Sequence, residues 1–134
     1  MNNSIAGIIF QDGLFLVGRR VEGGQMGGKW EFPGGKVDPG ETHEQTIIRE
    51  FHEELGLDAK PGEHITSVTF ENNSGTVELH AYRVFLSLEE NVTLSEHSEL
   101  SWATMAEIES LDMVDSDKLL VPFLKEWSLN DQVR

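Results

Sequence analysis

The chain has 134 residues, of which 38% are hydrophobic, so we predict one globular domain that spans residues 1–134. Its 24 acidic and 10 basic side chains give a formal net charge of −14, which argues against binding of a nucleic acid polymer. The sequence has no cysteine, which excludes disulfides and thiolate metal sites. It has no signal-peptide pattern and no apolar run near the ~20 residues of a membrane span, which predicts a cytoplasmic protein without membrane contact.

The first elements form a strand pattern. Residues 4–10 are largely apolar and predict a buried strand, Asp12-Gly13 predicts a hairpin turn, and residues 14–18 predict the return strand. The glycine-rich residues 21–29 predict a mobile loop. A short strand is expected at residues 30–32.

A helix is predicted over residues 42–55, directly behind the glycine-rich loop Phe32-Pro33-Gly34-Gly35, whose backbone can approach a ligand closely. Thr42 is a good N-cap, Gln45 completes a capping box, and Gly56 is a good C-cap. The apolar residues with helical spacing should form the buried stripe, namely Ile47, Ile48, Phe51 and Leu55.

The rest of the chain predicts further strands and two helices. The extended segments are residues 64–71, 76–86, 91–94 and 100–103, with a hairpin at residues 72–75 between the first two. Thr104 and Glu107 form a second capping box on a short helix, and a last helix is expected from residue 115 or 116 to about residue 127. Its apolar stripe is Leu119, Leu120, Phe123, Leu124 and Trp127. This order of elements predicts an α/β domain with a mixed sheet.

The central helix carries an unusual group of acids. Glu50, Glu53 and Glu54 stand at positions i, i+3 and i+4, so they lie on one face as near neighbours and repel one another. That face adjoins the apolar stripe, which puts the acids at the edge of the core. Hard oxygen ligands in such a row suit Mg²⁺ or Mn²⁺. The alternative is a solvated acidic surface.

The spacing around these acids is far more specific than the acids alone. Reading forward, the chain has Gly35, five residues, Glu41, seven residues, Arg49-Glu50, an apolar residue, one further residue, Glu53-Glu54, one residue, Gly56 and the apolar Leu57. This string resembles the Nudix box, the signature of the Nudix hydrolases. Residues 29–36 and 40–42 resemble the MutT-like nucleoside triphosphate pyrophosphohydrolases. The resemblance implies the Nudix fold, a mixed β-sheet sandwiched between α-helices.

The resemblance also implies a metal site. The implied ligands are the Gly35 carbonyl and the carboxylates of Glu50, Glu53, Glu54 and Glu96, with Glu50 and Glu54 the principal ones. Glu96-His97, with Trp102 six residues after Glu96, resembles the loop that brings an additional glutamate to the metal. Either Glu53 or Glu96 is expected to act as general base. The alternatives are an ordinary surface acid for Glu96 and an exposed loop residue for His97.

Arg49 should orient the glutamates through a bidentate ion pair with Glu41, because ligating carboxylates usually need supporting partners. The alternative is a helix-surface salt bridge worth under ~1 kcal/mol. The expected catalytic set is Glu41, Arg49, Glu50, Glu53, Glu54 and Glu96.

Four further residues are candidates for contact with substrate. Arg20 corresponds to a substrate-contacting arginine in the MutT-like pattern, and Lys36 is a nearby alternative for phosphate. Phe32 is a candidate for stacking on a base, with core packing as the alternative. Asp117 matches the position that reads the base edge, where the 8-oxoguanine-specific pattern has asparagine. An ionised aspartate only accepts hydrogen bonds, so it suits a guanine N1–H and amine or a cytosine amine.

The resemblance implies a Mg²⁺-dependent hydrolase that cleaves nucleoside triphosphates to the monophosphate and pyrophosphate, of the 8-oxo-dGTP type. A CTP or modified-dCTP pyrophosphohydrolase is the main alternative, followed by an ADP-ribose or dinucleoside polyphosphate hydrolase. A non-catalytic nucleotide sensor is a remote alternative, since such domains usually lose box glutamates. The sequence leaves open the base, the sugar, the number of metal ions, and whether the protein is a monomer or a homodimer.

Overall fold

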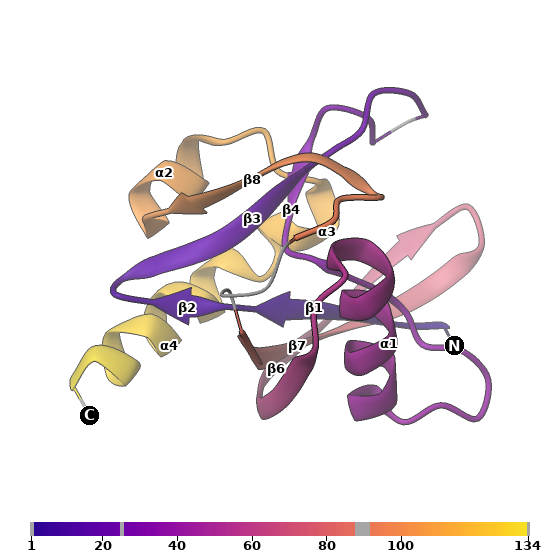
Figure 1. Cartoon of the computed structure of the whole chain (residues 1–134), viewed down its shortest axis with the longest axis horizontal. Helices are drawn as coiled ribbons and strands as arrows, with labels where there is room; N and C mark the ends of the chain where they lie inside the picture. The colour runs from indigo at the N-terminus through magenta and orange to yellow at the C-terminus, as the bar shows by residue number, and fades with distance from the viewer. Residues whose placement is uncertain (1, 25, 88–91, 134) are drawn as a thin grey trace.

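The computed structural model describes residues 2–24, 26–87 and 92–133, which form two four-stranded sheets and the helices that cover them (Figure 1). The first sheet contains β1 (Asn2–Ile8), β5 (Gly34–Lys36), β6 (Ala59–Asn72) and β7 (Gly75–Leu86). Its spatial order is β5-β1-β7-β6. Strand β1 runs parallel to β7 and antiparallel to β5, so this sheet is mixed.

The second sheet is antiparallel and is built around β3. It contains β2 (Phe10–Gln11), β3 (Leu14–Arg20), β4 (Trp30–Glu31) and β8 (His97–Ala103). Strand β3 pairs with each of the other three, and Gly18 lies opposite both Glu31 of β4 and Leu100 of β8. The second sheet therefore brings β4 and β8 together, although they are far apart in the sequence.

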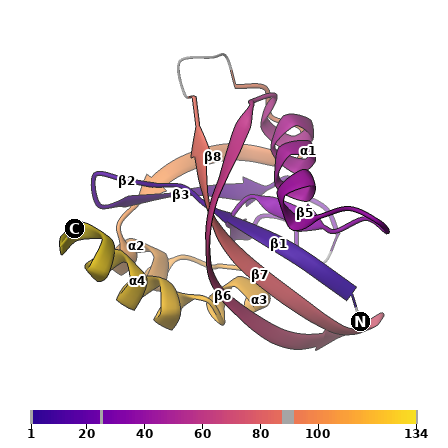
Figure 2. The ribbon, with the colours of Figure 1, turned by 90° about the horizontal axis from the view of Figure 1, so that it is seen from below.

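Helices cover both faces of the first sheet. They are α1 (His43–Leu55), α2 (Met105–Ser110), α3 (Asp115–Lys118) and α4 (Val121–Val133). Figure 2 shows α1 and α4 on opposite sides of β1, β6 and β7. Along β1, Ile5 belongs to the core on the α1 side, whereas Ala6 and Ile8 belong to the core on the α4 side. The prediction of an α/β fold with a mixed sheet between helices is confirmed.

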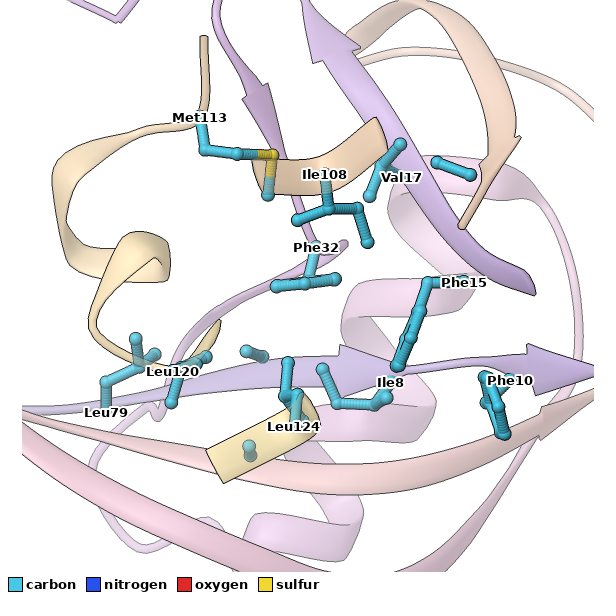
Figure 3. Close-up of a cluster of buried hydrophobic side chains, with 13 residues drawn as sticks. Ile8, Phe10, Phe15, Val17, Phe32, Leu79, Ile108, Met113, Leu120 and Leu124 are labelled. Carbon is cyan, nitrogen blue, oxygen red and sulfur yellow. The ribbon is translucent and has the colours of Figure 1, made fainter. Parts of the chain in front are cut away.

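The core on the α4 side holds much of the aromatic side-chain surface (Figure 3). Phe15 and Phe32 meet edge to face with ring centroids 6.3 Å apart, and Leu120 and Leu124 are fully buried. Full burial of such a side chain contributes roughly 1.5–3 kcal/mol. Phe32 is the first residue of the glycine-rich loop, so this core anchors one end of that loop.

Helix α1 has the predicted ends. The Thr42 side chain accepts from the Gln45 N–H, the Gln45 side chain accepts from the Thr42 N–H, and Gly56 adopts a left-handed conformation with φ of 68°. The prediction of its buried stripe is wrong at one position, because Ile48 is 49% exposed. The buried face is instead rotated toward Glu54.

Several strand boundaries differ from the predictions. Gly34 and Gly35 were expected to lie in the loop of residues 32–35, but with Lys36 they form β5 by pairing antiparallel with β1. The strand expected at residues 4–10 is divided between β1 and β2, because the chain passes from one sheet to the other at Ile9. Strand β6 begins at Ala59 and β8 at His97, earlier than expected, because long-range pairing with β7 and β3 extends them.

The last helix was predicted to be continuous, and this is wrong. Pro122 has no N–H to donate to the Lys118 carbonyl and would clash with it in an unbroken helix, so α3 ends and α4 begins anew at Val121. The predicted stripe is also wrong in part, since Leu119 is 43% and Phe123 47% exposed.

Two predicted segments remain. The extended piece at residues 91–94 begins outside the described residues, and residues 92–94 belong to no strand. The described residues of the predicted loop at 21–29 form bends and turns between β3 and β4. No helix in the described ranges is long and apolar enough to cross a membrane.

Candidate active site

Helix α1 holds three carboxylates in a graded row from the core to solvent. Glu54 is only 4% exposed, and its Oε2 accepts a hydrogen bond from the Gly34 N–H at 3.2 Å. The Glu50 side chain is 16% exposed and that of Glu53 is 58% exposed. The predicted acidic cluster therefore lies beside β5, with its innermost member in the protein interior.

Strand β5 passes very close to this row. A Cβ atom placed on Gly35 would stand 2.4 Å from the Glu50 carboxyl carbon, so any other residue here would displace the Glu50 carboxylate. Gly35 lies opposite Ile5 of β1. The register of the first sheet thus places the Gly35 backbone against Glu50.

Arg49 connects the acids with the loop before α1. Its Nε and Nη2 donate to the two Glu41 carboxylate oxygens at 2.7 and 2.9 Å, which is the bidentate geometry expected for this pair. Its Nη1 donates to Glu50 at 2.7 Å and to Glu53 at 3.3 Å, and Nη2 also donates to the Lys36 carbonyl at 2.9 Å. One guanidinium therefore holds two of the three helix acids and the end of β5.

The acids have unequal proton affinities. Hydrogen bonds from Arg49, and then from Thr46, lower the pKa of Glu41 to about 2. Burial, with nearby Glu50 and Glu31 as smaller causes, raises the pKa of Glu54 to about 9. Burial also raises the pKa of Glu50, against the opposing effect of Arg49. A cation near Glu54 would relieve this repulsion and favour the ionised carboxylate.

Glu31 and His97 join the site from the second sheet. His97 was considered as an exposed loop residue, but it begins β8 and its side chain is fully buried against Gly18. Its Nε2 lies 2.9 Å from Glu31 Oε2. Ligand atoms of Glu31, Glu54 and His97 all lie within 4.8 Å of one another. Glu31 was not predicted as a site residue, and its only signal in the sequence is its place immediately before the glycine-rich loop.

The segment that contains Glu96 lies against the C-terminal end of α1. Ser95 donates from its N–H to the Glu54 carbonyl at 3.2 Å and from its hydroxyl to the Glu53 carbonyl at 2.8 Å. Glu96 is exposed, its carbonyl accepts from the Val21 N–H, and its carboxylate is one of the charges that raise the pKa of Glu54. The structure thus brings Glu96 near the row of helix acids.

The two candidate cations for phosphate contact different parts of the site. Arg20 Nη1 is 3.2 and 3.3 Å from the two oxygens of Glu31, and its side chain is 38% exposed. Lys36 ends β5 with an exposed side chain. Arg20 therefore lies beside Glu31 and the inner acids, and Lys36 beside Arg49.

Phe32 and Asp117 meet at the inner end of the site. Phe32 is 3% exposed within the core, so its ring face is covered and its contact with the site is its backbone N–H. That N–H donates to Asp117 Oδ2 at 2.8 Å. Asp117, on α3, is 5% exposed, and burial raises its pKa to about 7 despite the Phe32 hydrogen bond.

A cavity of about 520 Å³ lies near the loop before α1, and Glu50, Glu53 and Glu54 are not among its lining residues. It is lined by the start of β1, the segment from Lys36 to Glu41, and the β6–β7 hairpin. Lys36 and Glu41 line the cavity, and both contact Arg49. The cavity is therefore next to the Arg49 network.

Comparison with known proteins agrees with this geometry. The family model described as "NUDIX domain" matches residues 1–124. The chain is 34% identical over 123 residues to "CTP pyrophosphohydrolase" of Escherichia coli, with 92% of this chain and 88% of that protein covered. It is 39% identical over 117 residues to "Putative 8-oxo-dGTP diphosphatase 2" of Mycobacterium tuberculosis, with 85% and 81% covered.

The fold is also similar to solved structures. The solution structure of the E. coli ORF135 protein superposes with a TM-score of 0.83 at 32% identity, covering 94% of this chain and 89% of that chain. Three findings indicate the same family. They are a family model that matches nearly the whole chain, a relative above 30% identity and a similar solved structure. The chain therefore belongs to the Nudix family and is a MutT-like Nudix hydrolase.

Proposed function

We propose that this hydrolase uses Mg²⁺ to cleave a nucleoside triphosphate into the monophosphate and pyrophosphate. The observation that carries the proposal is the Arg49 network, which holds Glu50 and Glu53 beside the buried Glu54. An ordinary solvated acidic face would have no need of a bidentate partner or of a buried member. Together with the family membership, this arrangement supports a site prepared for a divalent cation.

The residues present fit such a cation. The candidate ligands, Glu50, Glu53, Glu54, Glu96 and the Gly35 carbonyl, are all hard oxygen donors, as Mg²⁺ prefers. Burial and mutual repulsion raise the pKa of Glu50 and Glu54, so the site favours a bound positive charge. When bound, the metal would supply neutralisation of phosphate charge and a lower pKa for a water molecule.

The protein residues supply the rest of the chemistry. Arg49 orients the glutamates, and Arg20 and Lys36 are positioned to bind phosphate oxygens. Glu53 or Glu96 accepts a proton from the attacking water as the phosphoanhydride bond breaks and pyrophosphate leaves. Glu53 shares Arg49 with Glu50, whereas the Glu96 carboxylate has no ion pair among the described residues. Glu96 is therefore the candidate base whose carboxylate is not already held in an ion pair with a described residue.

Asp117 supports a second candidate substrate. Its buried carboxylate, when ionised, accepts from the N4 amine of cytosine or from the N1–H and amine of guanine. Similarity to the relative named as a CTP pyrophosphohydrolase supports a cytidine triphosphate as the substrate of this chain. Similarity to the relative named as a putative 8-oxo-dGTP diphosphatase supports an oxidised guanine nucleotide. We propose these two classes as the candidate substrates.

One set of assays tests both parts of the proposal. Specificity constants for 8-oxo-dGTP, dGTP, CTP, 5-methyl-dCTP and ADP-ribose, measured with Mg²⁺, should be highest for one of the modified or cytidine triphosphates. The Glu54→Gln variant should lose turnover on all of them. Unchanged turnover in that variant would contradict the metal site, and a clear preference for ADP-ribose would contradict the substrate class.

A further inference from the structure

A second group of ligand atoms lies on the inner side of Glu54. Glu31 of β4, Glu54 of α1 and His97 of β8 each contribute one atom, and these atoms lie within 4.8 Å of one another. The His97 side chain is fully buried, Glu54 is 4% exposed, and the Glu31 side chain is 13% exposed. Arg20 pairs with Glu31, but Glu54 has no ion pair among the described residues, so its buried carboxylate is unfavourable unless a cation or proton lies beside it.

The spacing of these atoms fits a coordination sphere. The His97 Nε2 and the Glu31 Oε2 are 2.9 Å apart. Two adjacent ligands of an octahedral ion with bonds of about 2.1 Å are separated by about 3.0 Å. On ion binding the His97 Nε2 must lose its proton and this hydrogen bond, and the ion then takes the place of that proton between two ligand atoms at about the required separation.

The imidazole distinguishes this group from the row of box glutamates. Mg²⁺ prefers oxygen ligands, whereas first-row transition metals accept imidazole as well as carboxylate. We propose that Glu31, Glu54 and His97 form a second cation site, which takes a transition-metal ion such as Mn²⁺ in preference to Mg²⁺. This inference deepens the proposed function and rests on it in one respect, because Glu54 serves both sites.

Arg20 competes with the ion for Glu31. Its Nη1 contacts both Glu31 oxygens at 3.2 and 3.3 Å, and a cation at Glu31 would repel the guanidinium. Since the Arg20 side chain is 38% exposed, it can turn outward. Ion binding therefore releases the candidate phosphate contact from its ion pair, which links the second site to phosphate binding.

The test uses Mn²⁺ alone on the full chain, with binding followed by electron paramagnetic resonance. Pulsed measurements on the wild type should show coupling to a directly bound imidazole nitrogen. His97→Gln should abolish this coupling and weaken Mn²⁺ binding roughly tenfold or more, at least as much as loss of a supporting partner does. Mg²⁺ binding should change little. Glu31→Gln should weaken Mn²⁺ binding, and Arg20→Gln should tighten it because the competing cation is gone.

The outcomes separate this inference from the proposed function. Nitrogen coupling that is absent from the wild type, or that persists in His97→Gln, would overturn the second site whatever the activity. Melting without metal shows whether His97→Gln folds. If it does not fold, the Mn²⁺ affinities of Glu31→Gln, Arg20→Gln and the wild type decide, and equal affinities would overturn the second site. Glu50→Gln is the matched control, which should lose Mg²⁺-dependent turnover but keep the nitrogen coupling. Coupling without nucleotide hydrolysis in the wild type would refute the proposed function alone.

Discussion

Replacement of Arg49 by lysine tests the central arrangement most directly. The guanidinium makes two bonds to Glu41, one strong bond to Glu50 and one to the Lys36 carbonyl, all between 2.7 and 2.9 Å. A single ammonium group keeps the charge but cannot reach all of these acceptors. Arg49→Lys should therefore leave the net charge unchanged and loosen the position of Glu50.

The expected magnitude follows from these contacts. A hydrogen bond to a charged group contributes roughly 1.5–3 kcal/mol. The Arg49 side chain is 27% exposed, so water will replace part of the lost interaction and the lower end of that range applies. At about 1.4 kcal/mol for each tenfold change, Mg²⁺ affinity should fall about tenfold.

The assay is the Mg²⁺ dependence of nucleotide turnover. Arg49→Lys should shift half-saturation to higher Mg²⁺, and saturating Mg²⁺ should restore most of the activity. Arg83→Lys is the matched control, because Arg83 of β7 also makes a short ion pair, at 2.6 Å to Asp131 of α4, and neither residue belongs to the acidic row of α1. An unchanged Mg²⁺ requirement in Arg49→Lys, or an equal shift in Arg83→Lys, would refute the orienting role.

Three further predictions concern single side chains. Without metal, the pKa of Glu54 in the folded protein is about 9 instead of 4.5, so its contribution to stability is present at low pH and is lost between about pH 4.5 and 9. Glu54→Gln should therefore make the melting temperature of the metal-free protein less sensitive to pH over this range. An unaltered pH profile of melting would contradict this prediction. Asp117→Asn should change the ratio of specificity constants for cytosine and guanine nucleotides with little change of kcat on the better one, whereas equal losses for all bases would show a structural role. Burial, and then the charge of His43, lowers the pKa of His80 below 6.5. The free energy of unfolding in urea should therefore fall as the pH drops below 6.5, and it should fall less in His80→Asn. A free energy of unfolding that rises as the pH drops would refute this prediction.

Helix α1 could be predicted in detail because its signals are local. The reciprocal bonds of Thr42 and Gln45 and the left-handed Gly56 depend only on neighbouring residues. The spacing of the box residues likewise lies within one helix and the loop before it. The family and the α/β fold followed from these features and from the order of the elements.

The parts that could not be predicted depend on contacts between distant segments. Strand β5 contains two glycines, which have low strand propensity, and exists because β1 pairs with it. Glu31 and His97 are 66 residues apart and meet because β3 pairs with both β4 and β8. Periodicity along the chain reports which face of an element is apolar, but not which distant polar group will lie beside it.

The orientation of α1 shows how the site and the core compete. Burial of Ile48 would contribute roughly 1.5–3 kcal/mol, and burial of a carboxylate is unfavourable. The helix nevertheless leaves Ile48 49% exposed and buries Glu54 to 4% exposure. Since apolar burial alone would favour the opposite rotation, the contacts of Glu50 with Gly35 and of Glu54 with Gly34 fix the helix where the acids converge. A cation that ionises Glu54 would recover part of this lost stability, so bound metal should stabilise the fold as well as the reaction.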